Sequence, residues 1–223
     1  MKRVRLHPGG NEMAPGKILC LGRNYPEHAR EMNAPVPEEP VVFLKPSSAL
    51  LPGGGRVVFP PFSREMHHEV EMVLLLGSEA RNIALQDAPR CIAGYGVGLD
   101  MTLRDIQAEA KRKGLPWTVA KGFDTSAPVS DFLRSELVED PAGLRLSLEV
   151  NGVLRQEASA EEMIFPPCEV LVWLSRIFTL EPGDLVFLGT PAGVGPVRPG
   201  DRLRARLQGV AELSVEIVSP EPS

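Results

Sequence analysis

Residues 65–77 read EMHHEVEMVLLLG, so that two glutamates lead directly into an unbroken apolar run. The first half alternates and the second half is continuously apolar, which predicts a β-strand that emerges from the core at one end. Because side chains two residues apart share one face of a strand, His67, Glu69 and Glu71 should point the same way. His67 can at most support the two carboxylates, whereas His68 should face the opposite side and have a structural role.

Two interpretations of Glu69 and Glu71 fit this stretch on its own. Carboxylates on the exposed face of an edge strand would discourage pairing with another chain. Alternatively, the pair holds a cation, since two carboxylates so close together repel each other unless a cation is shared. Asp100 favours the second interpretation, because it ends the glycine-rich strand GYGVGLD and could complete the site. Three carboxylates without cysteine specify a hard cation such as Mg²⁺, Mn²⁺ or Ca²⁺.

Short strands and turns, punctuated by glycine and proline, make up most of the remaining chain. Asn151-Gly152 is the strongest hairpin signal and lies within an alternating stretch. The elements together predict an α+β fold rich in β-structure, with a roll or distorted-barrel core and a few short helices. Two strands are expected within 144–157, one on each side of Asn151-Gly152, and further strands at 16–22, 39–46, 55–60, 185–189, 202–207 and 209–218.

Three helices are predicted. Residues 25–32 contain a proline followed by helix formers, which is typical of a first helical turn. The second helix should take Thr102 as its N-cap, with Asp105 three residues later, and end at Gly114. Residues 168–180 have the apolar spacing of a third helix.

The composition excludes several classes of protein. A chain of 223 residues can bury a substantial core, and its net charge of −5 argues against nucleic-acid binding. No apolar run approaches the roughly 20 residues of a membrane span. The basic start MKRVRLHPGG is not followed by the apolar segment of a signal peptide. The three cysteines lie far apart in apolar surroundings, which predicts buried thiols in a reducing cytoplasm and no zinc site.

Three further patterns indicate chemistry. His28 and Glu31 lie on one face of the first predicted helix, and their spacing fits either a general-base pair or a surface ion pair. Lys121 follows a strand-like apolar run in WTVAKGF and is either a cation at a strand end or a buried one. Residues 188–195, LGTPAGVG, lack the order of a phosphate loop. Their amides and the Thr190 hydroxyl could bind an anion, or the segment could be a plain turn.

Seven segments occur together in one order: CLGRNYPEHAREM, PVVFLKPSSAL, HHEVEMVLLLG, GYGVGLDMTLRDIQ, KGLPWTVAKGFDTSAPVS, NGVLRQEASAEEMIF and LEPGDLVFLGTPAGVGPVRPGD. In this combination they resemble the fumarylacetoacetate hydrolase family. The resemblance extends from Lys17 to Val218. The most similar branch is the small single-domain members, which include acylpyruvate hydrolases and oxaloacetate decarboxylases.

The resemblance implies the family's mixed β-roll fold and a homodimer. It implies a single catalytic domain over residues 17–223, preceded by an N-terminal extension, residues 1–16, to which no role is assigned. A mobile lid is expected at about residues 24–32, ordered over bound substrate.

The resemblance also assigns roles to individual residues. Glu69, Glu71 and Asp100 are the implied ligands of Mg²⁺ or Mn²⁺, for which Ca²⁺ could substitute. The implied catalytic residues are His28, Glu31 and Lys121. The implied substrate-binding residues are Arg23, Tyr25, Arg104, Gln107 and Thr190.

The implied activity is metal-dependent hydrolysis of the C–C bond of an acylpyruvate, such as acetylpyruvate or fumarylpyruvate. A 2-oxo acid could chelate the cation, which would stabilise the pyruvate enolate formed when the bond to C3 breaks. His28, oriented by Glu31, would take a proton from the attacking water, and Lys121 would stabilise negative charge on oxygen. Such an enzyme is expected to be cytoplasmic and to serve aromatic catabolism.

Two kinds of alternative remain open. Oxaloacetate decarboxylation or tautomerisation, or isomerisation of 2-hydroxyhepta-2,4-diene-1,7-dioate, could proceed through a related enolate at the same site. The presence of both His28 and Glu31 favours the hydrolase. A non-enzymatic alternative is a module whose carboxylates hold a structural Ca²⁺, although such a cage usually fills its coordination sphere with backbone and amide oxygens.

Overall fold

The computed structural model describes residues 2–220 and is built around a ten-stranded mixed sheet. Its strands are β1 (Val4–His7), β2 (Asn11–Met13), β3 (Ile18–Gly22), β4 (Val41–Lys45), β5 (Leu50–Pro52), β8 (Val70–Leu76), β9 (Ile92–Leu99), β11 (Ala127–Val129), β12 (Phe132–Arg134) and β15 (Leu185–Phe187). The main path runs β2-β1-β12-β9-β8-β15-β3-β4. Because β8 lies between β9 and β15, the strand that begins beside Glu69 is central, and the edge-strand interpretation is wrong.

Two smaller sheets complete the β-structure. The five-stranded sheet has the order β14-β13-β17-β18-β6, and the three-stranded sheet has the order β10-β7-β16. Their bounds are β6 (Gly55–Val58), β7 (Met66–His68), β10 (Thr102–Leu103), β13 (Arg145–Val150), β14 (Val153–Ser159), β16 (Gly195–Val197), β17 (Arg202–Leu207) and β18 (Ala211–Val218). The predicted hairpin joins β13 to β14, with φ values of 52° at Asn151 and 77° at Gly152 that suit a tight turn.

The main core lies between the ten-stranded and five-stranded sheets. Met72 and Leu74 of β8 pack in one buried cluster with residues of the opposite sheet such as Leu148. Val73 and Leu75 belong to a second buried cluster, on the other face of the large sheet. The apolar run of β8 is continuous because both of its faces are buried.

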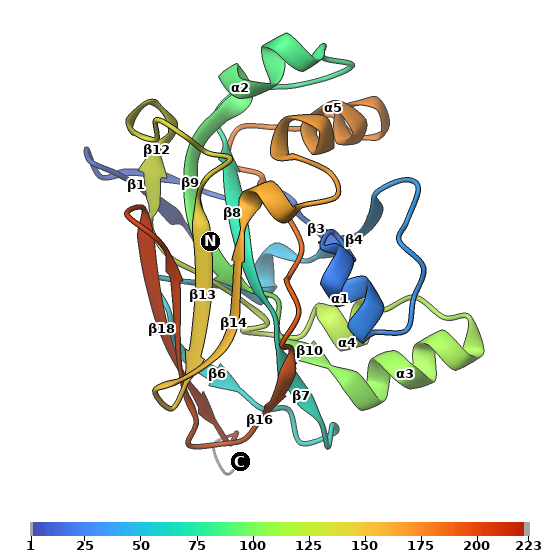
Figure 1. Cartoon of the computed structure of the whole chain (residues 1–223). Helices are drawn as coiled ribbons and strands as arrows, with labels where there is room; N and C mark the ends of the chain where they lie inside the picture. The colour runs from blue at the N-terminus through green and yellow to red at the C-terminus, as the bar shows by residue number, and fades with distance from the viewer. Residues whose placement is uncertain (1, 221–223) are drawn as a thin grey trace.

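Residues 2–220 contain five short α-helices and four single turns of 3₁₀-helix. Figure 1 shows α1, α3 and α4 gathered on one side of the sheets, and α2 and α5 at the opposite end from the C-terminus. The helices are α1 (Pro26–Glu31), α2 (Ala88–Cys91), α3 (Arg104–Lys113), α4 (Thr118–Lys121) and α5 (Pro167–Ile177). The 3₁₀ turns are η1 (Ser47–Ala49), η2 (Leu85–Asp87), η3 (Ser135–Leu137) and η4 (Ala160–Glu162).

The predicted α+β, β-rich roll is confirmed, with local corrections. The stretch 65–77 forms two strands of different sheets, β7 and β8, and Glu69 lies between them. The segment WTVAKGF was expected to be strand-like and is instead helix α4, with Lys121 as its last residue. The third predicted helix begins at Pro167 and ends at Ile177, since Phe178 is extended.

The predicted start of α3 is also wrong. Thr102 is in strand β10, and its hydroxyl donates a hydrogen bond to the backbone carbonyl of Asp100 at 3.1 Å. Leu103 takes the N-cap position without a side-chain cap, because Thr102 is held extended by pairing with β7. Asp105 does not complete a capping box and accepts hydrogen bonds from the loop before β7. Gly114 ends the helix as predicted, with a left-handed φ of 65°.

The N-terminal residues belong to the main sheet. Strands β1 and β2 form an antiparallel pair, and β1 continues the sheet by pairing in parallel with β12. The predicted N-terminal extension begins at residue 1, and the predicted catalytic domain ends with residues 221–223. These four residues lie outside the described part of the chain. No helix in residues 2–220 is long and apolar enough to cross a membrane. The three cysteines are free, and Cys168 is only half-buried.

Candidate active site

Three carboxylates converge where β8 and β9 lie side by side. Glu69 precedes β8, Glu71 is its second residue, and Asp100 directly follows β9. The Asp100 amide donates to the Glu69 carbonyl at 2.8 Å, which places these two residues opposite each other. One oxygen from each carboxylate lies within 4.8 Å of the other two, and all three side chains are buried. The predicted convergence is therefore confirmed, both for Glu69 and Glu71, which followed from strand alternation, and for Asp100, which followed from its place at the end of a glycine-rich strand.

Three cations surround two of these carboxylates. Lys121 Nζ lies 2.8 Å from Glu69 Oε2 and 2.6 Å from Asp100 Oδ2. Lys45 Nζ lies 2.8 Å from Asp100 Oδ1, and Arg104 Nη2 lies 2.6 Å from Glu69 Oε1. Burial raises the pKa of Glu69, but Lys121 and Arg104 outweigh this effect and lower it. Glu69 is therefore held as a charged group by protein cations, and Asp100 is paired with Lys121 and Lys45.

Glu71 has a different environment. Its Oε2 accepts a hydrogen bond from the Gly189 amide at 2.6 Å, and no lysine or arginine of residues 2–220 forms an ion pair with it. Burial raises its pKa well above the ordinary value, and the neighbouring charges of Asp100 and Glu69 raise it further. A cation bound beside Glu71 would therefore stabilise the charged form of this carboxylate.

A divalent cation fits this donor set. The ligand atoms are carboxylate oxygens only, as Mg²⁺ and Mn²⁺ prefer. Asp100 Oδ1 is buried, and the contact that it makes within residues 2–220 is the ion pair with Lys45 Nζ at 2.8 Å. A carboxylate oxygen carries more than one lone pair, so Oδ1 can bind a cation in addition to this ammonium.

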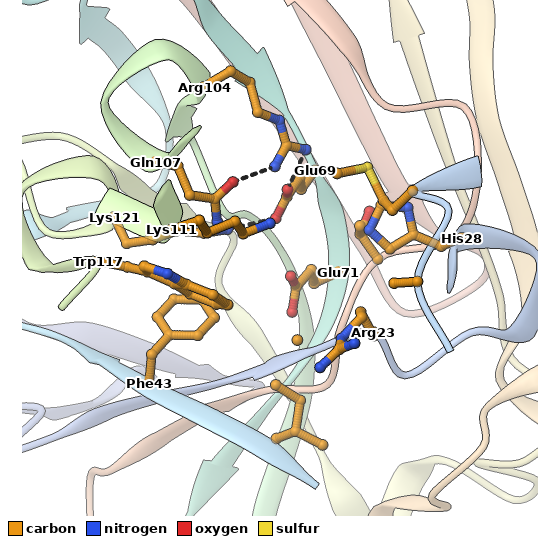
Figure 2. Close-up of a pocket in the computed structure, with 15 residues that line it drawn as sticks. Arg23, His28, Phe43, Glu69, Glu71, Arg104, Gln107, Lys111, Trp117 and Lys121 are labelled. Atoms are coloured by element: carbon orange, nitrogen blue, oxygen red, sulfur yellow. Dashed lines mark hydrogen bonds and ion pairs between the residues drawn. The ribbon is translucent and has the colours of Figure 1, made fainter. Parts of the chain in front are cut away.

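A cavity of about 310 Å³ is lined by two of the three carboxylates, Glu69 and Glu71. This volume is at the lower end of the range for small-molecule sites and suits a metabolite. Figure 2 shows Glu69 and Glu71 between two walls, one with His28 and the other with Trp117. All predicted site residues line this cavity except three: Tyr25, Glu31 and Asp100.

His28 and Glu31 form a pair at the side of the cavity. Both belong to α1, and His28 Nδ1 lies 3.1 Å from Glu31 Oε2. His28 is only 5% exposed, so this pair is not an ordinary surface ion pair. Glu31 is fixed in turn by the Gly193 amide, which donates to its Oε1 at 3.0 Å. The arrangement orients the imidazole and leaves its other ring nitrogen for a ligand.

Tyr25 lies away from the cavity. Its side chain is 1% exposed and packs in the main core. Its hydroxyl has no hydrogen-bond partner among the described residues, and burial together with the charge of Glu71 raises its pKa. Its implied role in substrate binding remains a prediction.

The glycine-rich segment 188–195 holds the site together. Its amides at Gly189 and Gly193 bind the carboxylates of Glu71 and Glu31, so these amides are used within the protein. Both glycines have positive φ, and a Cβ at Gly193 would lie 2.1 Å from a backbone oxygen. Thr190 lines the cavity, and its Oγ1 accepts a hydrogen bond from Gln156 at 2.8 Å. Of the two interpretations of residues 188–195, the structural turn therefore fits most of the segment better than the anion-binding one.

Several residues of the site were missed in the sequence. Lys45 is fully buried at the end of β4 and donates to three backbone carbonyls as well as pairing with Asp100. Asn24 is fully buried and bridges the backbone of Leu188 and Phe165, which anchors the start of α1. The sequence offers only two local signals for these residues. Lys45 is a lysine in an apolar strand, and Asn24 is an asparagine just before a helix. Phe43, Lys111 and Trp117 also line the cavity.

Comparison with known proteins places this chain among enzymes. The family model for the fumarylacetoacetate (FAA) hydrolase C-terminal domain matches residues 17–218. The mitochondrial oxaloacetate tautomerase FAHD1 of Bos taurus is 47% identical over 204 residues, which are 92% of each chain. Fumarylpyruvate hydrolase of Pseudomonas aeruginosa, solved with Mn²⁺ and pyruvate, superposes with a TM-score of 0.94 at 37% identity, covering 98% of this chain and 96% of that one. The 2-hydroxyhepta-2,4-diene-1,7-dioate isomerase of Mycobacterium marinum gives a TM-score of 0.83 at 34% identity, covering 94% and 77%.

Proposed function

We propose that this chain, which belongs to the fumarylacetoacetate hydrolase family, is a divalent-metal-dependent enzyme. Its proposed reaction is hydrolysis of the C–C bond of an acylpyruvate. The observation that supports this most strongly is the juxtaposition of a buried three-carboxylate cluster and the His28–Glu31 pair at one cavity. A structural metal site would have no need of a buried, oriented imidazole beside it.

The metal would be held by Glu69, Glu71 and Asp100. Mg²⁺ is the first candidate and Mn²⁺ the second, and Ca²⁺ could substitute, since all three prefer oxygen ligands. When bound, the cation supplies Lewis-acid stabilisation of negative charge on the oxygens of a 2-oxo acid. The structurally similar fumarylpyruvate hydrolase was solved with Mn²⁺ and pyruvate, which supports this assignment.

His28 is the proposed general base. Glu31 holds its Nδ1, so the other ring nitrogen accepts a proton from water. The water oxygen attacks the distal carbonyl carbon, and the bond between that carbon and C3 of the pyruvate unit then breaks. The products are a carboxylic acid and pyruvate enolate, which takes a proton at C3 to become pyruvate. Protons and electrons balance without a further reactant.

Cationic and polar side chains would position the substrate. Arg104 Nη1 donates to Gln107 Oε1 at 2.9 Å, so these two groups are oriented by each other at the cavity wall. Thr190 and Arg23 would bind the substrate carboxylate. Lys121 would stabilise the negative charge that develops on oxygen during the reaction. The ammonium of Lys121 is fully charged for this role, since Asp100 and Glu69 raise its pKa against the effect of burial.

Oxaloacetate tautomerisation is the second candidate activity. It is favoured by the 47% identity to oxaloacetate tautomerase FAHD1. It needs only a proton transfer between C3 and the keto oxygen, which His28 at the cavity wall would carry out. Decarboxylation of oxaloacetate or isomerisation of a hydroxyheptadienedioate would use the same groups without an attacking water.

Three broader assignments accompany this proposal. Residues 17–223 would act as one catalytic domain, and residues 24–32 would be a lid hinged at the buried Asn24. The chain would form a homodimer. We further propose a cytoplasmic enzyme of aromatic catabolism.

An activity panel tests the proposal. Acetylpyruvate, fumarylpyruvate, oxaloacetate and a hydroxyheptadienedioate are each assayed with Mg²⁺, with Mn²⁺ and with EDTA. We expect release of pyruvate from the first two substrates only when metal is present. Metal-independent turnover, or activity on oxaloacetate alone, would contradict the hydrolase assignment.

A further inference from the structure

One wall of the cavity is aromatic and carries an unpaired cation. Phe43 and Trp117 meet edge to face with ring centroids 5.9 Å apart. Lys111 Nζ lies 5.2 Å from the Trp117 ring centroid, and Lys121 Nζ lies 4.8 Å from the centroid of Phe43. Figure 2 shows this wall across the cavity from His28.

Lys111 differs from its neighbours in having no acidic partner. On the same helix, Glu109 pairs with Lys113 at 2.7 Å and with Arg112 at 2.7 Å. Within residues 2–220, the Lys111 ammonium forms no ion pair and lies over the Trp117 ring. Contact with an aromatic face holds an ammonium in place without neutralising it.

The cations around Lys111 add to a positive potential. Arg104 and Lys121 are paired with the metal-site carboxylates, but Arg23 lines the cavity without an ion-pair partner in the described part of the chain. Burial lowers the pKa of Lys111, and Arg104, Lys121 and Arg23 lower it further. All four of these cations line the cavity, so an anion bound in it would meet several positive charges.

The position of the wall indicates which part of a ligand it meets. The 2-oxo acid end of the substrate belongs beside Glu69 and Glu71, where the proposed metal site lies. The remainder of the molecule then extends along Phe43 and Trp117. A flat, conjugated chain would pack on these rings, and its far end would reach the cationic rim.

We propose that Lys111, held over Trp117, binds a second carboxylate at the far end of the substrate, so that the site selects 2-oxo diacids over 2-oxo monoacids. This inference rests on the proposed function, because it assumes that the 2-oxo acid end lies at the carboxylate cluster. It makes Lys111 a specificity-determining residue in addition to the groups that bind or activate the reacting atoms.

A binding experiment tests the inference without turnover. The Mg²⁺-loaded protein is titrated calorimetrically with 2-oxoglutarate and with 2-oxovalerate, which have equal chain length and differ in the distal carboxylate. We expect wild type to bind the diacid about tenfold more tightly, as one charge-assisted contact provides. Lys111→Met should reduce this preference to about twofold, whereas the control Lys113→Met should retain it. An unchanged preference in Lys111→Met would overturn the inference.

A kinetic experiment separates the inference from the proposed function. For Lys111→Met, kcat/KM should fall about tenfold more for fumarylpyruvate than for acetylpyruvate, which lacks the distal carboxylate. Equal losses for both substrates would overturn the inference while leaving the hydrolase intact. If wild type cleaves neither substrate, the proposed function fails, and the 2-oxo acid titration still decides the role of Lys111.

Discussion

Replacing Glu71 by glutamine should stabilise the metal-free protein and abolish its response to Mg²⁺. Glu71 is the buried carboxylate that has no ion-pair partner in residues 2–220, and it lies beside two other carboxylates. Glutamine keeps an oxygen to accept the Gly189 hydrogen bond and removes the negative charge. In wild type that charge has a cost in free energy until a cation is bound.

The size of this effect follows from the geometry. Two carboxylates separated by the 4.8 Å that bounds the cluster repel by about 3.5 kcal/mol at an effective dielectric constant of 20. The charges of Glu69 and Asp100 are largely cancelled by Lys45, Lys121 and Arg104, so less than this remains. We therefore expect Glu71→Gln to raise the free energy of unfolding of the metal-free protein by about 2 kcal/mol.

The effect should depend on pH in a defined direction. Burial, Asp100 and Glu69 raise the folded-state pKa of Glu71, so its ionisation favours the unfolded state. Wild type and variant should have equal stability below about pH 4.3, where the unfolded-state glutamate is also protonated. The advantage of the variant should grow as the pH rises towards the folded-state pKa and stay constant above it.

Urea unfolding at pH 4 and pH 8, in EDTA and in Mg²⁺, measures all of these quantities. In EDTA at pH 8 the variant should be the more stable protein. In Mg²⁺ wild type should gain about 2.7 kcal/mol at a concentration one hundred times its Kd, and the variant should gain little. Glu79→Gln, at an exposed glutamate, serves as the control and should change stability by less than about 0.5 kcal/mol. A Glu71→Gln protein that is less stable than wild type in EDTA, yet still stabilised by Mg²⁺, would refute the reasoning.

The remaining predictions concern the proposed base, the packing of β9 and the start of α1. His28→Gln removes the proposed general base and should lower kcat for acetylpyruvate by about 10²–10⁴-fold, with Mg²⁺ binding retained in calorimetry. Gly98→Ala should lower the free energy of unfolding by about 1–3 kcal/mol, because its Cβ would lie 2.7 Å from the Phe187 ring. Asn24→Ala breaks two hydrogen bonds to Phe165 and the buried one to Leu188, and should cost about 2 kcal/mol in urea unfolding, with faster amide exchange in α1.

Each of these predictions has a result that would contradict it. Wild-type turnover in His28→Gln would exclude the imidazole as the base. Gly195→Ala is the control for Gly98→Ala, since its Cβ would meet only one atom, at 3.4 Å, and equal effects of both substitutions would contradict the packing argument. Unchanged amide exchange in Asn24→Ala would show that the bridge does not hold α1.

Local patterns in the sequence predicted much of the fold and the centre of the site. Strand alternation placed Glu69 and Glu71 together, and the end of a glycine-rich strand placed Asp100 beside them. The close approach expected of GYGVGLD is present, because a Cβ at Gly94 would lie 2.6 Å from a backbone oxygen. These features depend on residues near in sequence or on the ends of adjacent strands.

Features that depend on distant segments were not predictable in this way. Lys45 reaches Asp100 because β4, at one edge of the main sheet, packs against α4, whose last residue, Lys121, also pairs with Asp100. Thr102 has the composition of a helix cap, but pairing of β10 with β7 holds it extended. Lys111 and Trp117 are ordinary residues of a polar helix and a turn, and only the folded chain brings them to the cavity wall.

The central claim is that Glu69, Glu71 and Asp100 bind a catalytic divalent cation. The most direct test is an anomalous difference map from crystals grown with Mn²⁺ and pyruvate. We predict one strong peak per chain, within coordination distance of an oxygen of each carboxylate and of pyruvate. A map in which Mn²⁺ is absent from this cluster, with Lys121 still bonded to both Glu69 and Asp100, would contradict the account.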